Sequence, residues 1–308
     1  MRVATIDIGT NTVLLLVAER GPDGALHAVA ERATITRLGE GVDRTRTLAP
    51  AAIERTRAAL EEYAAVVREI GADRMAVVGT SAMRDAVGGD ELRRDIRELF
   101  GVDVRVLRGA EEARLTFVGA LSGLSRTGTP APSMVFDIGG GSTEVVVGRP
   151  ALHGPEIQLA ESYDIGSVRL TERHVSHDPP TREEVALVRR SAGSALAGAP
   201  RPALADAPVG VAGTMTTLAS VALALPRYDG ALVHGFEMTR AALDEVVTRL
   251  ASIDLATRRR LPGMEPKRAD VIIAGGVIAL AVLEWAGAER VCISDRGVRW
   301  GLAEELSA

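Results

Sequence analysis

Two short segments carry residue types and spacings suited to binding a phosphate. Residues 7–12 read DIGTNT and residues 137–144 read DIGGGSTE. Each lies between an apolar run and a β-branched run, which predicts a tight turn between two strands. In such a turn, backbone N–H groups and hydroxyls can face an anion. An ordinary glycine-rich β-turn has the same composition, but the recurrence of the pattern favours a phosphate loop.

Two widespread nucleotide-binding loops do not fit these segments. A dinucleotide-binding loop requires G-x-G-x-x-G followed at once by a helix, whereas Gly139, Gly140 and Gly141 are contiguous and a β-branched run follows them. A P-loop requires Gly-Lys followed by Ser or Thr, which the chain does not contain. The interpretation that remains is a strand–turn–strand hairpin whose turn faces an anion.

Composition limits the class of protein. The chain has 308 residues, of which 46% are hydrophobic and 25% charged, enough for two globular domains. No long apolar run or signal-peptide pattern occurs, so we expect a cytoplasmic protein without membrane contact. The net charge of −5 argues against nucleic acid as a partner. The single cysteine, Cys292, excludes an intrachain disulfide and is expected in a strand.

The elements that position the two loops alternate between strand and helix along the chain, which predicts an α/β fold. Residues 50–70 have helical periodicity, with Pro50 in the first turn and Gly71 at the C-terminal end. Residues 123–133 are rich in Gly, Pro, Ser and Thr and are the candidate domain boundary. The order of elements begins again after this boundary.

Three further segments raise questions about turns and metal ligands. Residues 209–219 and 271–285 are each expected to form a glycine turn that leads from an apolar run into a helix. The apolar stripe of the second is expected in a protein core. His174 and His177 have the spacing of a metal pair on a helix, but the two prolines that follow favour a loop, and we do not expect a metal there.

Six motifs together resemble the exopolyphosphatase and guanosine pentaphosphate phosphatase (Ppx/GppA) family, within the actin, Hsp70 and sugar-kinase superfamily. In chain order they are DIGTNT (7–12), GTSAMRDA (79–86), RGAEEARL (108–115), DIGGGSTE (137–144), GVAGTMTTLA (210–219) and KRADVIIAGG (267–276). The resemblance covers nearly the whole chain. EEARL followed by DIGGGSTE is its most specific part.

The resemblance implies two ribonuclease-H-like (actin-like ATPase) domains that face each other across a cleft, in the short, two-domain type of the family. The first domain would comprise residues 1–123 together with a C-terminal helix at 297–308, and the second residues 124–296. One position departs from the family pattern. The final motif, usually Arg-Glu-Gly, reads RWG here, so Trp300 replaces the acid and a role at this position is in doubt.

The resemblance also implies roles for individual residues. Glu112 would orient or deprotonate the attacking water, Arg84 would contact phosphate, and Asp137 and Glu144 would hold Mg²⁺ or Mn²⁺. The phosphate-binding residues would be Asp7, Thr10, Asn11, Gly139, Gly140, Gly141, Ser142, Gly213 and Thr214. Taken alone, Glu111 and Glu112 have another explanation, because acids are favoured at a helix N-terminus without any function.

These features predict a phosphoanhydride hydrolase that releases terminal orthophosphate from inorganic polyphosphate, with guanosine pentaphosphate as another candidate substrate. The alternatives are a non-catalytic sensor of polyphosphate or alarmone and, less favoured, a small-molecule kinase of the same superfamily. The sequence does not rank the two substrates. It also leaves the oligomeric state open, with a homodimer as a candidate.

Overall fold

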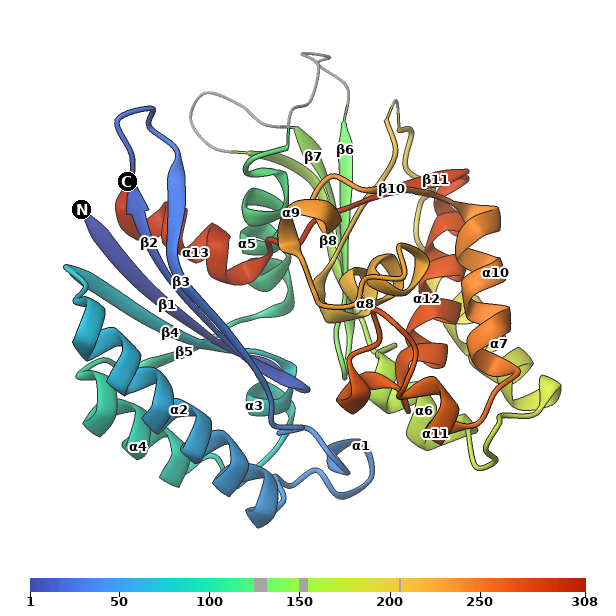
Figure 1. The fold of residues 1–308 in the computed structure, drawn as a ribbon, viewed down its shortest axis with the longest axis horizontal. Coiled ribbons are helices and arrows are strands. Elements are labelled where there is room, and N and C mark those ends of the chain that lie inside the picture. Colours follow the sequence, from blue (N-terminus) through green and yellow to red (C-terminus); the bar gives the residue numbers. More distant parts are fainter. Residues whose placement is uncertain (125–131, 150–154, 205) are drawn as a thin grey trace. The chain divides into compact units, whose positions relative to one another are not determined.

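The computed structural model describes residues 1–124, 132–149, 155–204 and 206–308. The chain divides into two compact units, residues 1–123 with 297–308 (unit 1) and residues 124–296 (unit 2). Each unit is a mixed sheet with helices packed on it, so the two-domain α/β fold is confirmed (Figure 1). The expected cleft between the domains stays a prediction. Most of the predicted boundary, residues 125–131, lies outside the described residues.

The sheet of unit 1 places three strand ends at one edge. Its order is β3-β2-β1-β4-β5, in which β1 is antiparallel to β2 and parallel to β4, and β4 is parallel to β5. The carboxyl ends of β1, β4 and β5 therefore share one edge. The strands are β1 (Arg2–Ile8), β2 (Thr12–Arg20), β3 (Leu26–Ile35), β4 (Arg74–Gly79) and β5 (Val104–Val106).

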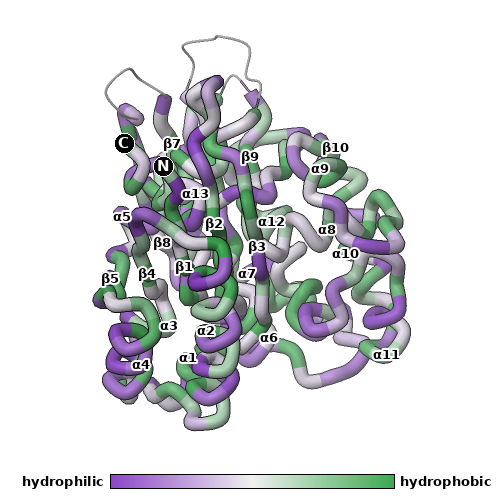
Figure 2. Tube along the Cα trace, turned by 60° about the vertical axis from the view of Figure 1, so that its left-hand side comes forward, coloured by the Kyte–Doolittle hydropathy of each residue, from purple (hydrophilic) through white to green (hydrophobic). Residues whose placement is uncertain are grey.

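Helices cover both faces of this sheet. Strand residues Ala4, Ile6 and Ile8 point to one face, where α2 and α4 pack, while Val3 points to the opposite face, which α13 covers (Figure 1). Hydrophilic and hydrophobic segments alternate along α2 and α4, as expected for helices with one buried side (Figure 2). The helices are α1 (Val42–Thr45), α2 (Pro50–Ile70), α3 (Ser81–Asp85), α4 (Asp90–Phe100), α5 (Gly109–Leu121) and α13 (Val298–Ser307).

The boundaries predicted for α2 are confirmed. The helix begins at Pro50 and is closed by Gly71, which has φ 77° and whose N–H donates to the carbonyl of Val67. A residue with a side chain is strained at this φ, so glycine suits the position.

Helices α5 and α13 touch backbone to backbone. A Cβ added to Gly119 would overlap the carbonyl of Gly297, and one added to Gly301 would overlap the carbonyl of Leu115. Glycine at these positions lets the two helices approach more closely than side chains would permit. The C-terminal helix therefore fixes the position of α5.

Unit 2 repeats the strand order of unit 1. Its sheet has the order β10-β11-β9-β6-β7-β8, so β8-β7-β6-β9-β11 corresponds to β3-β2-β1-β4-β5, and β10 is an added edge strand. The strands β6, β9 and β11 are parallel and their carboxyl ends share one edge. The strands are β6 (Ser133–Ile138), β7 (Thr143–Arg149), β8 (Glu156–Tyr163), β9 (Val209–Val211), β10 (Glu237–Thr239) and β11 (Arg290–Ile293).

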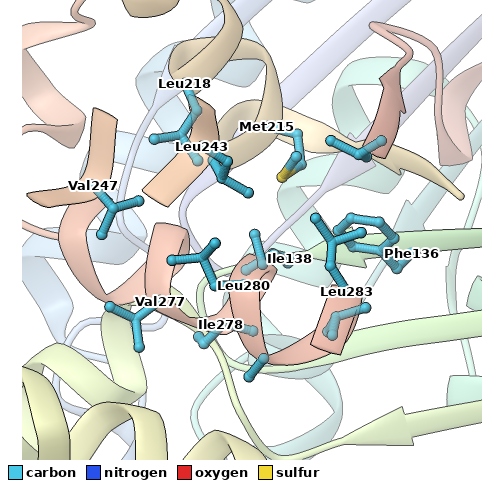
Figure 3. Packing of buried hydrophobic residues seen from close by; sticks show 14 of the residues in the cluster. Phe136, Ile138, Met215, Leu218, Leu243, Val247, Val277, Ile278, Leu280 and Leu283 are labelled. Atoms are coloured by element: carbon cyan, nitrogen blue, oxygen red, sulfur yellow. The ribbon is translucent and has the colours of Figure 1, made fainter. Parts of the chain in front are cut away.

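The core of unit 2 is organised around α12, whose residues are nearly all buried. Val277, Ile278, Leu280 and Leu283 of this helix pack with Phe136 and other apolar side chains (Figure 3). The expected core role is confirmed. The helices are α6 (Ser167–His174), α7 (Arg182–Leu196), α8 (Ala212–Ala222), α9 (Gly230–Val233), α10 (Arg240–Ala251), α11 (Leu255–Arg258), the 3-10 helix η1 (Pro266–Arg268) and α12 (Ile272–Ala286).

The glycine turn expected within 271–285 is wrong, because Gly275 and Gly276 lie inside α12. Both are sites of close packing. A Cβ at Gly275 would lie 2.5 Å from Cγ2 of Thr214, and one at Gly276 would overlap the side chain of Val247. The turn expected within 209–219 is present, where β9 leads into α8.

Other local predictions have clear outcomes. Cys292 lies in β11, as expected. His174 ends α6 and contacts the hydroxyl of Ser191, whereas His177 contacts Glu184 at the start of α7, so the two histidines have different partners. Hydrogen bonds from His177 and Ser176 hold the pKa of Glu184 well below its usual range. Among the described residues, no helix is long and apolar enough to span a membrane.

Candidate active site

The turn after β1 is held by its carbonyl groups. The N–H of Gly9 donates to the carbonyl of Thr12 at 3.0 Å, and a Cβ on Gly9 would lie 2.9 Å from that oxygen. The carbonyl of Thr10 accepts from Gly39, and that of Asn11 accepts from Thr36 at 3.1 Å. A trans peptide points its C=O and the following N–H in opposite directions. The N–H groups of Asn11 and Thr12 therefore point away from residues 36–39, which donate the hydrogen bonds to these carbonyls.

Polar side chains of this turn are buried at the carboxyl edge of the sheet. The side-chain oxygens Thr10 Oγ1 and Ser81 Oγ lie 2.7 Å apart. Ser81 comes shortly after the end of β4. Asn11 is 5% exposed, and neither its Oδ1 nor its Nδ2 has a hydrogen-bond partner among the described residues. Asp7 is buried one residue before the end of β1, on the face opposite Ile6 and Ile8. An unpaired buried amide is costly unless a ligand or water satisfies it.

Glu112 and Arg84 are brought together at the same edge. Arg84 lies on α3, which follows β4, and Glu112 lies in the first turns of α5, which follows β5. Arg84 Nη1 donates to Glu112 Oε2 at 3.2 Å and to the carbonyl of Leu107 at 3.0 Å. Glu112 is 7% exposed. The structure thus pairs the two residues expected to be catalytic, although they lie on different elements.

Glu111 has a different environment from its neighbour. Its carboxylate lies 3.3 Å from Arg105 Nε, and its side chain is 34% exposed, compared with 9% for Glu112. Successive side chains on a helix diverge by about 100°, so the two carboxylates point to different sides of α5. Glu112 is the one that faces Arg84.

The turn after β6 is built like the turn after β1. The N–H of Gly139 donates to the carbonyl of Ser142 at 3.0 Å, the same bond as between Gly9 and Thr12. The strand pairs match as well, since Ile138 opposes Thr143 where Ile8 opposes Val13. The repeat seen in the sequence is therefore also a repeat in backbone geometry.

Helix α6 holds the carbonyls of the Gly139–Ser142 turn. The carbonyl of Gly139 accepts from the N–H of Ser167 at 2.9 Å, and that of Gly140 accepts from Val168 at 3.0 Å. The carbonyl of Gly141 accepts from Arg169 Nε at 2.5 Å. Because these three C=O groups point to α6, the N–H groups of the residues that follow them point away from it, as an anion-binding concavity requires. These are the N–H groups of Gly140, Gly141 and Ser142.

The segment that holds this turn was not predicted from the sequence. Residues 164–167 read DIGS, a third copy of the Asp-Ile-Gly pattern, which was the signal available. A Cβ at Gly166 would overlap the backbone of Gly140 and Gly141. Only glycine allows the start of α6 to approach the turn this closely.

Gly166→Ala is expected to lower kcat/KM for phosphate release by about tenfold or more while the protein stays folded. The new methyl group must displace the turn, and misplaced contacts between the turn and a phosphate lower the rate. Gly193→Ala is the matched control, since a Cβ at Gly193 in α7 meets nothing within 4 Å. Steady-state kinetics and circular dichroism of both variants provide the measurement. Equal activity of the two variants would contradict the role given to Gly166.

Two carboxylates lie side by side next to the turn. Asp137 on β6 and Glu144 on β7 are directly opposed in the antiparallel register, and Ser162 on β8 opposes Glu144. The hydroxyl of Ser162 donates to Glu144 Oε1 at 2.7 Å. In the part of the chain that the structure describes, no set of three or more His, Cys, Asp or Glu side chains is placed to hold a metal. Two carboxylates suit Mg²⁺, which keeps several waters and substrate oxygens as ligands.

Comparison with known proteins identifies the family of this site. A model of the Ppx/GppA phosphatase family matches residues 16–307, most of the chain. The chain belongs to the Ppx/GppA phosphatase family. Among curated members, exopolyphosphatase 2 of Mycobacterium tuberculosis is 41% identical over 325 residues, with 99% of this chain and 98% of the relative covered. Exopolyphosphatase 1 of Mycobacterium bovis is 30% identical over 312 residues, with 98% and 87% covered.

Solved structures of Ppx/GppA proteins have the same fold. A crystal structure of the Aquifex aeolicus family member has a TM-score of 0.83 at 34% identity and covers 100% of this chain and 98% of its own. A crystal structure of an exopolyphosphatase-like protein has a TM-score of 0.91 at 34% identity and covers 99% of this chain and 98% of its own. The predicted family and actin-like ATPase fold are confirmed.

Two other residues that the Ppx/GppA motifs indicate lie after β9, at the start of α8. Thr214 Oγ1 donates to the carbonyl of Ile138 at 3.0 Å, which links α8 to the end of β6. A Cβ at Gly213 would overlap the guanidinium of Arg268, so this cation lies directly against Gly213. Their expected role in phosphate binding stays a prediction, and in this structure the Thr214 hydroxyl proton is donated within the protein.

Proposed function

We propose that this chain is an exopolyphosphatase, which hydrolyses the terminal phosphoanhydride of inorganic polyphosphate and releases orthophosphate. Guanosine pentaphosphate is a second candidate substrate. Membership of the Ppx/GppA phosphatase family supports hydrolysis of phosphate compounds. The names of the curated relatives support polyphosphate as the substrate.

The observation that carries the proposal is the pair of Arg84 with the buried carboxylate of Glu112, 3.2 Å apart. A phosphoryl-transfer site needs a group that positions or deprotonates water and a cation near the transferred phosphoryl group. Arg84 uses Nη1 and Nε in its contacts with Leu107, Glu112 and Asp85. No partner for its Nη2 is found among the described residues, so this donor is available to a phosphate oxygen.

In the proposed reaction, water attacks the terminal phosphorus while the bond to the bridging oxygen breaks. Glu112 accepts the water proton, and the bridging oxygen leaves as the new end of the shortened chain. Negative charge spreads over the equatorial oxygens of the transferred group. N–H groups that point out of the Gly9–Thr12 turn, together with Arg84 of the same unit, would stabilise that charge through fixed dipoles and charge.

Asp137 and Glu144 are the residues that would hold a divalent cation, with Ser162 orienting Glu144. A bound Mg²⁺ supplies positive charge that neutralises phosphate oxygens. The carboxylates themselves would repel a polyanion, so the proposal requires a cation between them and the substrate. This reasoning supports Mg²⁺ or Mn²⁺ as the cofactor.

Excess EDTA is expected to abolish phosphate release from polyphosphate, and added Mg²⁺ is expected to restore it. Ser162→Ala is expected to raise the Mg²⁺ concentration for half-maximal activity by about tenfold or more, since it removes a hydrogen bond that orients a metal ligand. The measurement is phosphate release across a Mg²⁺ titration. Full activity in EDTA, or an unchanged Mg²⁺ requirement in Ser162→Ala, would count against this cation site.

Phosphate release from polyphosphate with Mg²⁺ tests the activity itself. A sensor would bind polyphosphate without releasing phosphate, and a kinase would consume ATP in the presence of a sugar, so ATP with a sugar panel is the control. Guanosine pentaphosphate is assayed in parallel to rank the substrates. The expected cytoplasmic location and homodimer stay predictions, the second of which light scattering can test.

A further inference from the structure

Two glycines let the C-terminal helix α13 approach α5, the helix that carries Glu112. A Cβ on Gly301 of α13 would lie 2.0 Å from the carbonyl oxygen of Leu115 in α5. In the other direction, a Cβ on Gly119 of α5 would lie 2.0 Å from the carbonyl oxygen of Gly297. Both overlapping atoms belong to the backbone, so no side-chain rotation relieves the overlap. Because the two helices lie side by side (Figure 1), any side chain at position 301 must displace one of them.

This contact lies one turn from the acid of the candidate active site. Leu115 follows Glu112 by three residues, which is about 4.5 Å along the helix axis. The N–H of Glu112 donates to the carbonyl of Arg108 at 2.9 Å, so regular helical hydrogen bonding includes the acid. Successive turns of a helix are joined by such bonds. A displacement of the backbone at Leu115 is therefore passed on to Glu112.

The partner of Glu112 depends on the same part of the fold. Arg84 Nη1 donates to Glu112 Oε2 at 3.2 Å and to the carbonyl of Leu107 at 3.0 Å. Leu107 and Leu115 belong to one buried cluster with Leu302 of α13. Helix α13 thus packs with the residue whose carbonyl holds Arg84 and with the helix that carries Glu112.

Neighbouring residues of α13 have different partners. Trp300 belongs to a cluster with Val3 and Leu16 of the unit 1 sheet, whereas Gly301 meets the backbone of α5. Successive residues of a helix diverge by about 100°, which places these two on different sides. A substitution at Gly301 therefore tests the contact with α5 separately from the packing of Trp300.

We propose that Gly301 is a positioning residue of the candidate active site. Because it has no side chain, it sets the distance between α13 and α5 and thereby keeps the Glu112 carboxylate beside Arg84. Gly301 acts through the backbone of α5 rather than on the substrate. The inference rests on the proposed exopolyphosphatase activity, in which Glu112 accepts the proton of the attacking water.

The first test measures geometry and does not depend on activity. Crystal structures of the native protein and of Gly301→Ala give the distance between Arg84 Nη1 and Glu112 Oε2. We expect this distance to increase by about 1 Å in Gly301→Ala, a displacement large enough to impair catalysis. An unchanged distance in a folded Gly301→Ala protein overturns the proposal.

Gly297→Ala is the matched control. Gly297 caps the same helix four residues earlier, its φ is −154°, and a Cβ there meets nothing within 4 Å. Its variant should keep the distance between Arg84 and Glu112 near 3.2 Å. An equal displacement in both variants would show that the effect does not come from the overlap at Gly301, and would also overturn the proposal.

Kinetics then tests whether the displacement acts through Glu112. The kcat of Gly301→Ala for phosphate release is expected to fall by about tenfold or more, while that of Gly297→Ala stays near the native value. In a Glu112→Gln background, Gly301→Ala should lower kcat by less than about twofold, because the acid that Gly301 positions is already lost. The full loss in that background would assign Gly301 a general structural role and overturn the proposal.

The two measurements separate this inference from the proposed function. If the native protein releases no phosphate from polyphosphate, the proposed function is wrong, and the distance between Arg84 and Glu112 in the variants still decides the role of Gly301. If phosphate is released and Gly301→Ala has native geometry and native kcat, the positioning role alone is wrong.

A milder pair of substitutions serves if the denaturant midpoint shows that Gly301→Ala does not fold. Leu302→Val removes one methylene group from the cluster with Leu107 and Leu115, whereas Trp300→Phe trims the side of α13 that packs on the sheet. Leu302→Val should lower kcat by about threefold, and Trp300→Phe should keep native kcat. Equal kcat values in these two variants would overturn the proposal.

Discussion

Replacing Glu112 with glutamine is expected to lower kcat for phosphate release by about 10² to 10⁴, because glutamine keeps the size of the side chain but cannot accept the water proton. The carboxylate is buried and faces Arg84 at 3.2 Å, so glutamine can retain that hydrogen bond. Substrate binding should therefore persist. Steady-state kinetics measures kcat, and equilibrium binding of polyphosphate measures affinity.

Glu111→Gln is the matched control for this prediction. Glu111 precedes Glu112 on the same helix turn, yet its side chain is one-third exposed and pairs with Arg105 at the surface. A surface ion pair of this type contributes about 0 to 1 kcal/mol, so Glu111→Gln should keep nearly full activity. If Glu111→Gln is the inactive variant, or if both behave alike, the assignment of the water-activating residue is wrong.

Trp300→Ala is expected to destabilise the protein by about 3 to 5 kcal/mol, because it removes a large buried side chain and leaves a cavity. Trp300 is 2% exposed and packs on the sheet of unit 1 with Val3, Leu16, Leu26 and Ala303. The denaturant midpoint, followed by circular dichroism, measures the loss. Trp300→Phe should lose less, since it keeps most of the apolar volume.

The position of Trp300 in this core also explains what it does in the RWG motif, where it replaces the usual acid. It belongs to the same buried cluster as Val3, which lies near the amino end of β1, four residues and about 13 Å along the strand before Asp7. KM of folded Trp300→Phe should therefore match that of the native protein. The chain has two tryptophans, and Trp285, a half-buried residue of unit 2, provides the control substitution to alanine. An unchanged midpoint in Trp300→Ala would show that this residue does not support the core.

Much of the fold could be predicted because local rules specify it. Pro50 and Gly71 mark the ends of α2 since one suits the first turn of a helix and the other the conformation that closes it. The apolar and β-branched runs around DIGT and DIGG give the two hairpins, and the repeated pattern gives the repeated sheet order. The six motifs then indicate the family to which the chain belongs.

The predicted turn at Gly275 and Gly276 was wrong because a glycine pair can either form a turn or allow close packing within a helix. The local sequence suggests that a helix is interrupted at this pair. In the structure, the two glycines lie inside the buried helix α12 and leave room for the side chains of Thr214 and Val247 to pack against it. The packing partner of a glycine is distant in sequence, so its presence cannot be inferred from a local pattern.

By itself, the sequence determined the family, the two-domain α/β architecture, the two glycine turns and the residue types expected to act on phosphate. Only the tertiary structure showed that Glu112, which the motifs had already indicated, is buried beside Arg84, and that Trp300 belongs to a core. It also revealed that DIGS at 164–167 holds the second turn. The physical reason is that burial and backbone hydrogen bonding depend on contacts between segments far apart in the chain, which are fixed only when the sheets form and the helices pack on them.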